Sequence, residues 1–126
     1  MPHTLPATGL AAHAKALEAA GITLKLVSRV PLPFKPIADQ AIRSAASVPA
    51  NLAEGHGRRG RDRLHHWRIA YGSAKEVDTH LQLLVHAAAV KAAEAVQALD
   101  LFDQVRAMTW RLLHPTSGSA TISSPV

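Results

Sequence analysis

Four stretches of this chain carry apolar residues at intervals of three and four, and this periodicity constrains the fold more than any other feature. Such spacing places the apolar side chains on one side of an α-helix. Prolines interrupt it between residues 31 and 36, and glycines interrupt it between residues 55 and 60. The predicted helices cover residues 10–29, 37–54, 62–89 and 91–113. Four helices of about 20 residues joined by short links predict an all-α, up-down-up-down four-helix bundle.

The length and composition agree with a single domain. The chain has 126 residues, and its 48% apolar content is enough for one core. We expect a flexible leader over residues 1–9, the bundle domain over residues 10–113 and a disordered tail over residues 114–126. Cysteine is absent, and we find no signal peptide and no apolar run of about 18 residues. These features predict a soluble, cytoplasmic protein.

The apolar stripes identify the expected core of each helix. In the first helix the expected stripe joins Leu10, Leu17 and Leu24, which recur at intervals of seven, with Ala20 and Val27 between them. The stripe of the third helix ends at Ala88, and that of the fourth begins at Val96. We expect these side chains to face the interior of the bundle.

Two residues interrupt the stripes. Pro49 lies inside the second one and cannot donate a hydrogen bond to the Ala45 carbonyl, so we expect a kink there rather than the end of the helix. Asp78 replaces an apolar residue at one turn of the third helix. It marks either an interface or a buried polar contact.

Three short blocks of sequence form a more specific pattern. They run from Gln40 to Arg43, from Ser47 to Gly55 and from Ala70 to Glu76. A mid-helix proline among polar residues, as in Ser-x-Pro-x-Asn-x-x-Glu-Gly, is hard to produce by composition alone. Over residues 40–78 the chain resembles the four-helix-bundle proteins encoded by intervening sequences in bacterial 23S ribosomal RNA genes. The accessory variability protein of diversity-generating retroelements is a related protein. The motif residues are Ser47, Pro49, Asn51, Glu54, Gly55, Gly72, Ser73 and Glu76.

The resemblance carries implications for assembly and partners. It implies a four-helix protomer that assembles into a homopentameric barrel. In the retroelement branch it also implies a basic surface that binds nucleic acid and a partner reverse transcriptase, although nothing else in the sequence supports the latter. It implies no enzymatic activity and no cofactor, and most members of the family have no established molecular function.

Ser47, Asn51 and Glu54 share one face of the second helix, since they lie at i, i+4 and i+7. This row is either a binding site or a hydrogen-bond network that satisfies the carbonyl freed by Pro49. A buried carboxylate in the row would need a donor, which Ser73 or an arginine could supply. The pattern favours the structural network.

Ser73, Glu76 and His80 similarly share a face of the third helix, where Gly72 permits close backbone approach. Glu76 and His80 could bind one metal ion. A di-iron bundle site needs Glu-x-x-His on two helices, and that motif does not occur in this chain. The histidines are scattered without a His-x-x-x-His pair, so we predict no metal site.

The run from Gly55 to Gly60 spells G-x-G-x-x-G. In dinucleotide-binding folds this fingerprint follows a strand and opens a helix. Here it follows a predicted helix, so we expect the glycines to shape a turn instead.

The positive charge is concentrated after this turn. The chain carries a formal net charge of +5, and residues 58–68 account for five arginines against Asp62, or +4. Trp67 lies among them and could stack on a base, but its place in the apolar stripe favours core packing. The candidate nucleic-acid-binding residues are Arg58, Arg59, Arg61, Arg63 and Arg68.

Three readings of function follow from these observations. The leading one is a non-enzymatic homo-oligomer whose basic turn binds the backbone of RNA or DNA, with five copies forming a ring of positive potential. The alternative is a protein-interaction scaffold in which the arginines meet acidic protein surfaces. The third is a metal-dependent enzyme using Glu76 and His80, which the sequence disfavours.

Overall fold

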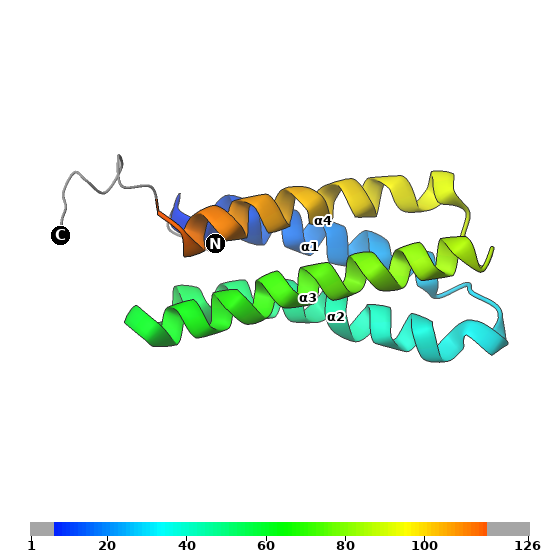
Figure 1. The fold of residues 1–126 in the computed structure, drawn as a ribbon, viewed down its shortest axis with the longest axis horizontal. Helices are drawn as coiled ribbons and strands as arrows, with labels where there is room; N and C mark the ends of the chain where they lie inside the picture. The colour runs from blue at the N-terminus through cyan, green and yellow to red at the C-terminus, as the bar shows by residue number, and fades with distance from the viewer. Residues whose placement is uncertain (1–6, 116–126) are drawn as a thin grey trace, which may run out of the picture.

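The computed structural model describes residues 7–115 and shows four helices in up-down-up-down order (Figure 1). They are α1 (Ala7–Val27), α2 (Lys35–His56), α3 (Gly60–His86) and α4 (Ala92–Leu113), with a short 3-10 helix, η1 (Leu32–Phe34), before α2. The described residues contain no strand. The predicted all-α four-helix bundle is therefore confirmed.

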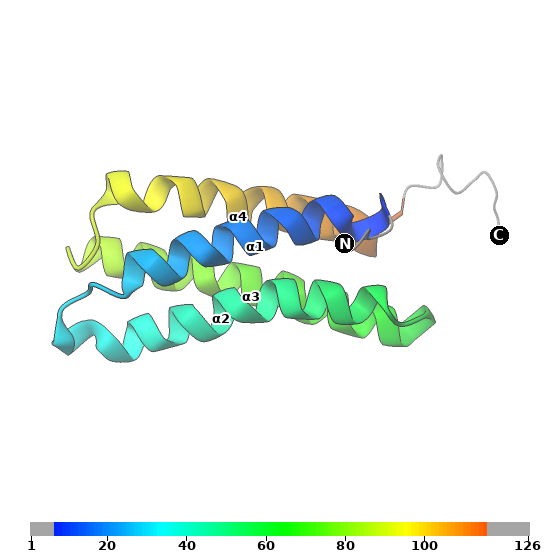
Figure 2. The same cartoon turned by 180° about the vertical axis from the view of Figure 1, so that it is seen from behind.

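The helices form a closed square in which each packs against two neighbours. α1 lies against α2 and α4, and α3 lies against the same two helices from the opposite corner (Figures 1 and 2). The turn between α2 and α3 lies at the same end of the bundle as the last turn of α4, while the other two links lie at the far end. The short link between α3 and α4 makes them antiparallel neighbours, as the sequence predicts.

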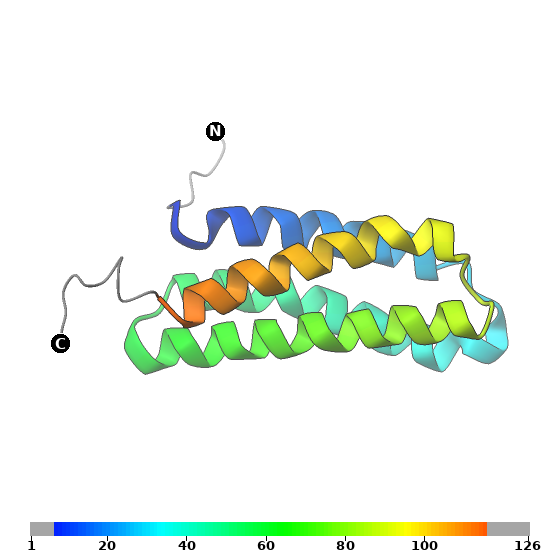
Figure 3. The same ribbon diagram turned by 45° about the horizontal axis from the view of Figure 1, so that its top comes forward.

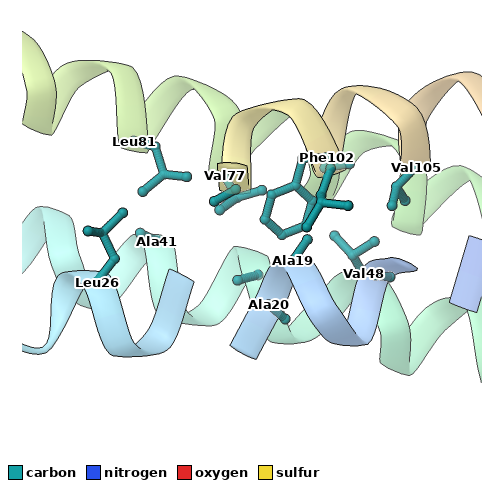
Figure 4. Close-up of a cluster of buried hydrophobic side chains, with 14 of the residues drawn as sticks. Ala19, Ala20, Leu26, Ala41, Val48, Val77, Leu81, Phe102 and Val105 are labelled. Carbon is teal, nitrogen blue, oxygen red and sulfur yellow. The ribbon is translucent and has the colours of Figure 1, made fainter. Parts of the chain in front are cut away.

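The core is built from alanine and a few larger side chains. Phe102, Leu81 and three valines are fully buried at its centre (Figure 4). Alanines from all four helices fill the remaining space, which lets the helix axes approach closely. The fully buried alanines are Ala16, Ala19, Ala41, Ala45, Ala70, Ala74, Ala95 and Ala98.

The stripe predicted for α1 is wrong in part, because Ala20 and Val27 are buried as expected but two of its leucines are not. Leu17 and Leu24 are 54% and 41% exposed, and the buried face carries small residues such as Ala16 and Ala19 instead. The physical reason is space, because the ring of Phe102 occupies the same core cluster and leaves α1 room for alanine. The side chain of Leu10 lies outside the described residues.

Two other expected stripe positions are also wrong. Val96, the expected start of the α4 stripe, is half exposed because Ala95 and Ala98 face the core in its place. Ala88 lies beyond the end of α3, where its φ of 59° belongs to the link rather than to a helix. The link continues with Val90, which is buried.

Several helix bounds differ from those predicted. α1 begins at Ala7, within the expected leader, and residues 1–6 and 116–126 lie outside the described part of the chain. Pro36 lies in the first turn of α2, where a missing N–H removes no helical hydrogen bond. α2 continues through Pro49 to His56, as expected for a proline that does not end the helix.

Asp78 makes the polar contact that its position in the stripe predicts. It accepts a 2.7 Å hydrogen bond from Arg106 Nη1, which joins α3 to α4, and both side chains are largely buried. Arg106 also donates to Asp103 at 2.6 Å. Burial opposes the charge on Arg106, but the hydrogen bonds that it donates to the two carboxylates, together with their negative charge, outweigh burial and raise the pKa of the guanidinium.

Replacement of Phe102 by alanine tests the core. The cavity left by the ring lowers the free energy of unfolding by about 3–5 kcal/mol, measured by urea denaturation. Val96→Ala on the same helix removes a half-exposed side chain and changes stability by about 0.5 kcal/mol or less. Equal losses in the two variants would contradict this assignment of the core.

Candidate nucleic-acid interface

The predicted polar row lies between α2 and α3 and forms a hydrogen-bond network. Ser73 Oγ donates to Ser47 Oγ at 2.9 Å, and Asn51 Nδ2 donates to the Ser47 hydroxyl and carbonyl at 3.0 and 2.9 Å. Asn51 Oδ1 accepts a 3.0 Å hydrogen bond from His66 Nδ1. The acceptor carbonyl is that of Ser47, not that of Ala45, so the predicted role in satisfying the carbonyl freed by Pro49 is wrong. The network instead connects two helices.

His66 is the member of this network that sequence reasoning missed. It precedes Ser73 by seven residues, so the two side chains lie on the same side of α3. That spacing was the available signal. With His66 and Ser73 both bonded to α2, this face of α3 is fixed against its neighbour.

Glu54 does not belong to the network, which corrects the predicted row. Its carboxylate is about half exposed and accepts hydrogen bonds from Arg58 Nε and Nη2 at 3.0 and 2.7 Å. Arg58 Nη1 also donates to Asp62 at 2.8 Å, and this hydrogen bond lowers the pKa of the Asp62 carboxyl. The same two carboxylates raise the pKa of Arg58. Arg58 therefore bridges the end of α2 and the start of α3, with its charge balanced on both sides.

Arg63 is also used within the fold. Its Nε and Nη2 donate to the carbonyls of Gly55 and His56, both at 3.1 Å, at the last turn of α2. The Gly55 carbonyl also accepts a 3.1 Å hydrogen bond from the Arg58 amide, so the guanidinium adds to the backbone cap of the helix and complements its dipole. The Cζ of Arg63 lies 5.3 Å from the centre of the Trp67 ring, within range of a cation–π contact.

Gly55 is required by close packing. A Cβ at this position would lie 2.6 Å from Trp67 Cδ1 and 3.0 Å from the Arg63 carbonyl oxygen, so no larger side chain fits. Trp67 is 4% exposed and donates from Nε1 to the Leu52 carbonyl at 3.3 Å. Core packing of Trp67 is confirmed, and base stacking on it is excluded.

The other glycines of the G-x-G-x-x-G run shape the turn. Gly57 follows the end of α2, and Gly60 begins α3 with a φ of +56° that favours glycine. The run follows a helix and not a strand, as predicted, and the dinucleotide fingerprint therefore lacks its structural context.

Arg59, Arg61 and Arg68 are the exposed remainder of the arginine cluster. Among residues 7–115 they form no ion pair within 4 Å, unlike Arg58. Arg61 and Arg68 are seven residues apart, and exposed Lys75 follows after seven more, so all three share the solvent face of α3 over roughly 21 Å. Lys75 was missed by sequence reasoning, although its spacing was visible. We call Arg59, Arg61, Arg68 and Lys75 the basic stripe.

The remaining motif residues of α3 have separate surroundings. Glu76 is exposed, His80 is half-buried, and the described residues hold no group of three histidine or acidic side chains placed to bind a metal ion. Gly72 is exposed, and a Cβ there would meet no atom within 4 Å. The expected close backbone approach at Gly72 is therefore absent within the protomer.

No helix in the described part of the chain is long and apolar enough to cross a membrane.

Comparison with known proteins agrees with this architecture. The model of a family described as 23S rRNA-intervening sequence protein matches residues 11–111. The chain is also similar to a crystal structure of a protein with unknown function from the S23 ribosomal protein family of Bacteroides thetaiotaomicron VPI-5482. The TM-score is 0.76 at 20% sequence identity, and the match covers 84% of this chain and 97% of the other, which shows a shared fold. A search of curated proteins gave no match.

Substitution of Gly55 by alanine tests the contact with Trp67. The added methyl group would displace the indole or the backbone, and we expect the free energy of unfolding to fall by about 1–3 kcal/mol. In the control Gly72→Ala the methyl group enters open space inside a helix, so stability should rise by up to about 1 kcal/mol. Thermal denaturation measures both, and a neutral Gly55→Ala would contradict the tight contact.

Proposed function

The chain belongs to the 23S rRNA-intervening sequence protein family, and from this premise we propose that it is a non-enzymatic homo-oligomer whose basic stripe binds the backbone of RNA or DNA. The observation that best supports this proposal is that the arginine cluster divides into residues bonded within the fold and residues exposed to solvent. Arg58 and Arg63 are held by partners within the fold, whereas Arg59, Arg61 and Arg68 present their charge to solvent. Unpaired cations along one helix face attract phosphates and release counterions when they bind them.

The surroundings of the two serines in the polar network support a non-enzymatic role. Ser47 and Ser73 donate and accept within one network, and His66 in that network faces an amide rather than a carboxylate. A nucleophile of the serine type needs a histidine base that is itself oriented by an acid. The network lacks that acid.

The outer face of α1 supports self-association. Leu17 and Leu24 are exposed there, and the turn between them carries Gly21, whose Cβ position is open. Exposed leucines around a glycine allow another helix to approach closely. We assign this face to a second copy of the chain and propose a pentamer, in which the basic stripe is repeated five times around an axis.

Neutralising the basic stripe tests nucleic-acid binding. The triple variant Arg59→Gln, Arg61→Gln, Arg68→Gln should bind a labelled RNA or DNA strand more weakly. The negative slope of log K against log salt concentration should become shallower by about 2–3. Fluorescence anisotropy from about 50 mM salt upward measures both quantities.

A charge-matched control separates position from net charge. Lys25→Gln, Arg29→Gln and Lys91→Gln remove the same charge from exposed positions at the far end of the bundle, and binding should be largely retained. Equal weakening in the two triple variants would contradict the stripe. Absence of binding by the unaltered protein, together with nuclease-resistant co-purification of one acidic protein, would favour the scaffold alternative.

The proposed assembly predicts a molar mass of five times 13.4 kDa by light scattering. Leu17→Glu with Leu24→Glu should yield monomers of unchanged helix content, because burying the added carboxylates at an interface is costly. Val96→Glu places the same charge on a half-exposed site of α4 and should leave the oligomer intact. A monomeric unaltered protein at high concentration would contradict the assembly.

A further inference from the structure

A second feature of the surface lies beside the basic stripe, in the outer groove between α3 and α4. This open groove has a volume of about 520 Å³. It is lined by Tyr71, Asp103, Arg106, Ala107, Trp110 and Arg111. The groove thus combines two aromatic rings with two arginines.

Trp110 is the distinctive residue of this groove. Unlike the buried Trp67, it is 48% exposed. Its indole is stacked on His114, with ring centroids 4.1 Å apart and planes inclined by 23°, and His114 Nδ1 lies 2.9 Å from the Trp110 carbonyl oxygen. The stack restrains an exposed indole that also lines the groove, so a flat surface is held in place before any ligand arrives.

The charges around the groove favour an anionic ligand. Arg111 is exposed, and the Nζ of Lys75 lies 5.8 Å from the centre of the Tyr71 ring. The acidic residue of the groove, Asp103, shares Arg106 with Asp78, so these three side chains carry a net charge of −1, and the exposed Arg111 and Lys75 leave one positive charge in excess around the groove. A ligand that carries phosphates therefore meets positive charge on both sides of the rings.

The groove and the basic stripe are adjacent. Arg68, Tyr71 and Lys75 lie at i, i+3 and i+7 on α3, so the aromatic ring lies one turn from each cation. The start of α3 and the end of α4 meet at the same end of the bundle (Figure 3). Phosphates bound along the stripe would consequently place their bases next to the groove.

We propose that this groove binds an unpaired base of a single-stranded nucleic acid, with Trp110 as the stacking surface. The inference rests on the proposed function and adds to it the class of ligand. A single strand can turn a base out onto an aromatic ring, whereas the bases of a duplex are already stacked on one another. Stacking accepts any base, which agrees with a groove that offers rings rather than an array of amide groups.

The test compares strands that share phosphates but differ in bases. The probes are oligo(dT), oligo(U), an abasic strand of the same length and the corresponding duplex. Trp110→Ala should weaken binding of both base-bearing single strands by about 5- to 100-fold and leave the abasic strand unaffected. Trp110→Phe should retain most of the affinity, because it keeps an aromatic face. The oligo(dT) and oligo(U) arms distinguish DNA from RNA.

Controls and fluorescence make the outcome decisive. Leu83→Ala truncates a side chain on α3 that is as exposed as Trp110, and it should not change the affinity for any strand. Circular dichroism should show that each variant folds. Base-bearing strands should quench the fluorescence of the unaltered protein but not that of Trp110→Phe, in which buried Trp67 is the remaining tryptophan.

The two failures are distinguishable. Equal affinity for abasic and base-bearing strands, with no effect of Trp110→Ala, would overturn the base-binding groove and leave phosphate binding by the stripe intact. Absence of binding to every strand, the abasic one included, would overturn the proposed function itself. Tighter binding of the duplex than of the single strands would also overturn the groove proposal.

Discussion

The contact between Trp67 of α3 and Gly55 of α2 determines how the functional end of the bundle is built. The indole lies against the glycine so closely that a single methyl group would not fit. It also donates to the Leu52 carbonyl, and Arg63 lies over its ring while capping the last carbonyls of α2. The turn between the two helices spans residues 57–59, and Arg59 and Arg61, at the start of α3, are exposed.

This arrangement explains why neighbouring arginines divide into two groups, one bonded within the fold and one exposed to solvent. A helix end leaves carbonyls without partners, and a tight turn brings carboxylates from both helices together. Arg63 and Arg58 satisfy these two demands, respectively. Once they are satisfied, further arginines gain nothing by folding back and remain exposed. A cluster that reads as one basic motif therefore supplies both the turn and the proposed binding surface.

The sequence was sufficient to predict the bundle, the Ser47–Asn51 part of the polar row and the packing of Trp67, because each depends on spacing along one helix. It was insufficient wherever the answer depended on a neighbouring helix. Leu17 and Leu24 form a proper helical stripe, yet the side of α1 that enters the core cluster of Phe102 carries mainly alanines, such as Ala16 and Ala19. Glu54 has the spacing of the polar row, but Arg58, four residues further on in the turn, holds it at the surface, and this local pairing was already visible in the i, i+4 spacing. The sequence did not indicate a binding role for Trp110, since the groove that it lines also needs Tyr71 from α3.

Helix α3 connects these observations. Residues seven positions apart lie on nearly the same side of the helix, and three such sets of residues face three different surroundings. His66 and Ser73 bond to α2, Tyr71 and Asp78 face α4, and Arg61, Arg68 and Lys75 face solvent. Seven residues drift by only about 20° from a straight line on an α-helix, so each series stays on its own side over two repeats. A rotation of α3 about its axis would break the Ser47–Ser73 and Asp78–Arg106 contacts together. The polar contacts on two sides of the helix thus fix the direction of the third, charged side, and the proposed binding surface depends on hydrogen bonds that never touch a ligand.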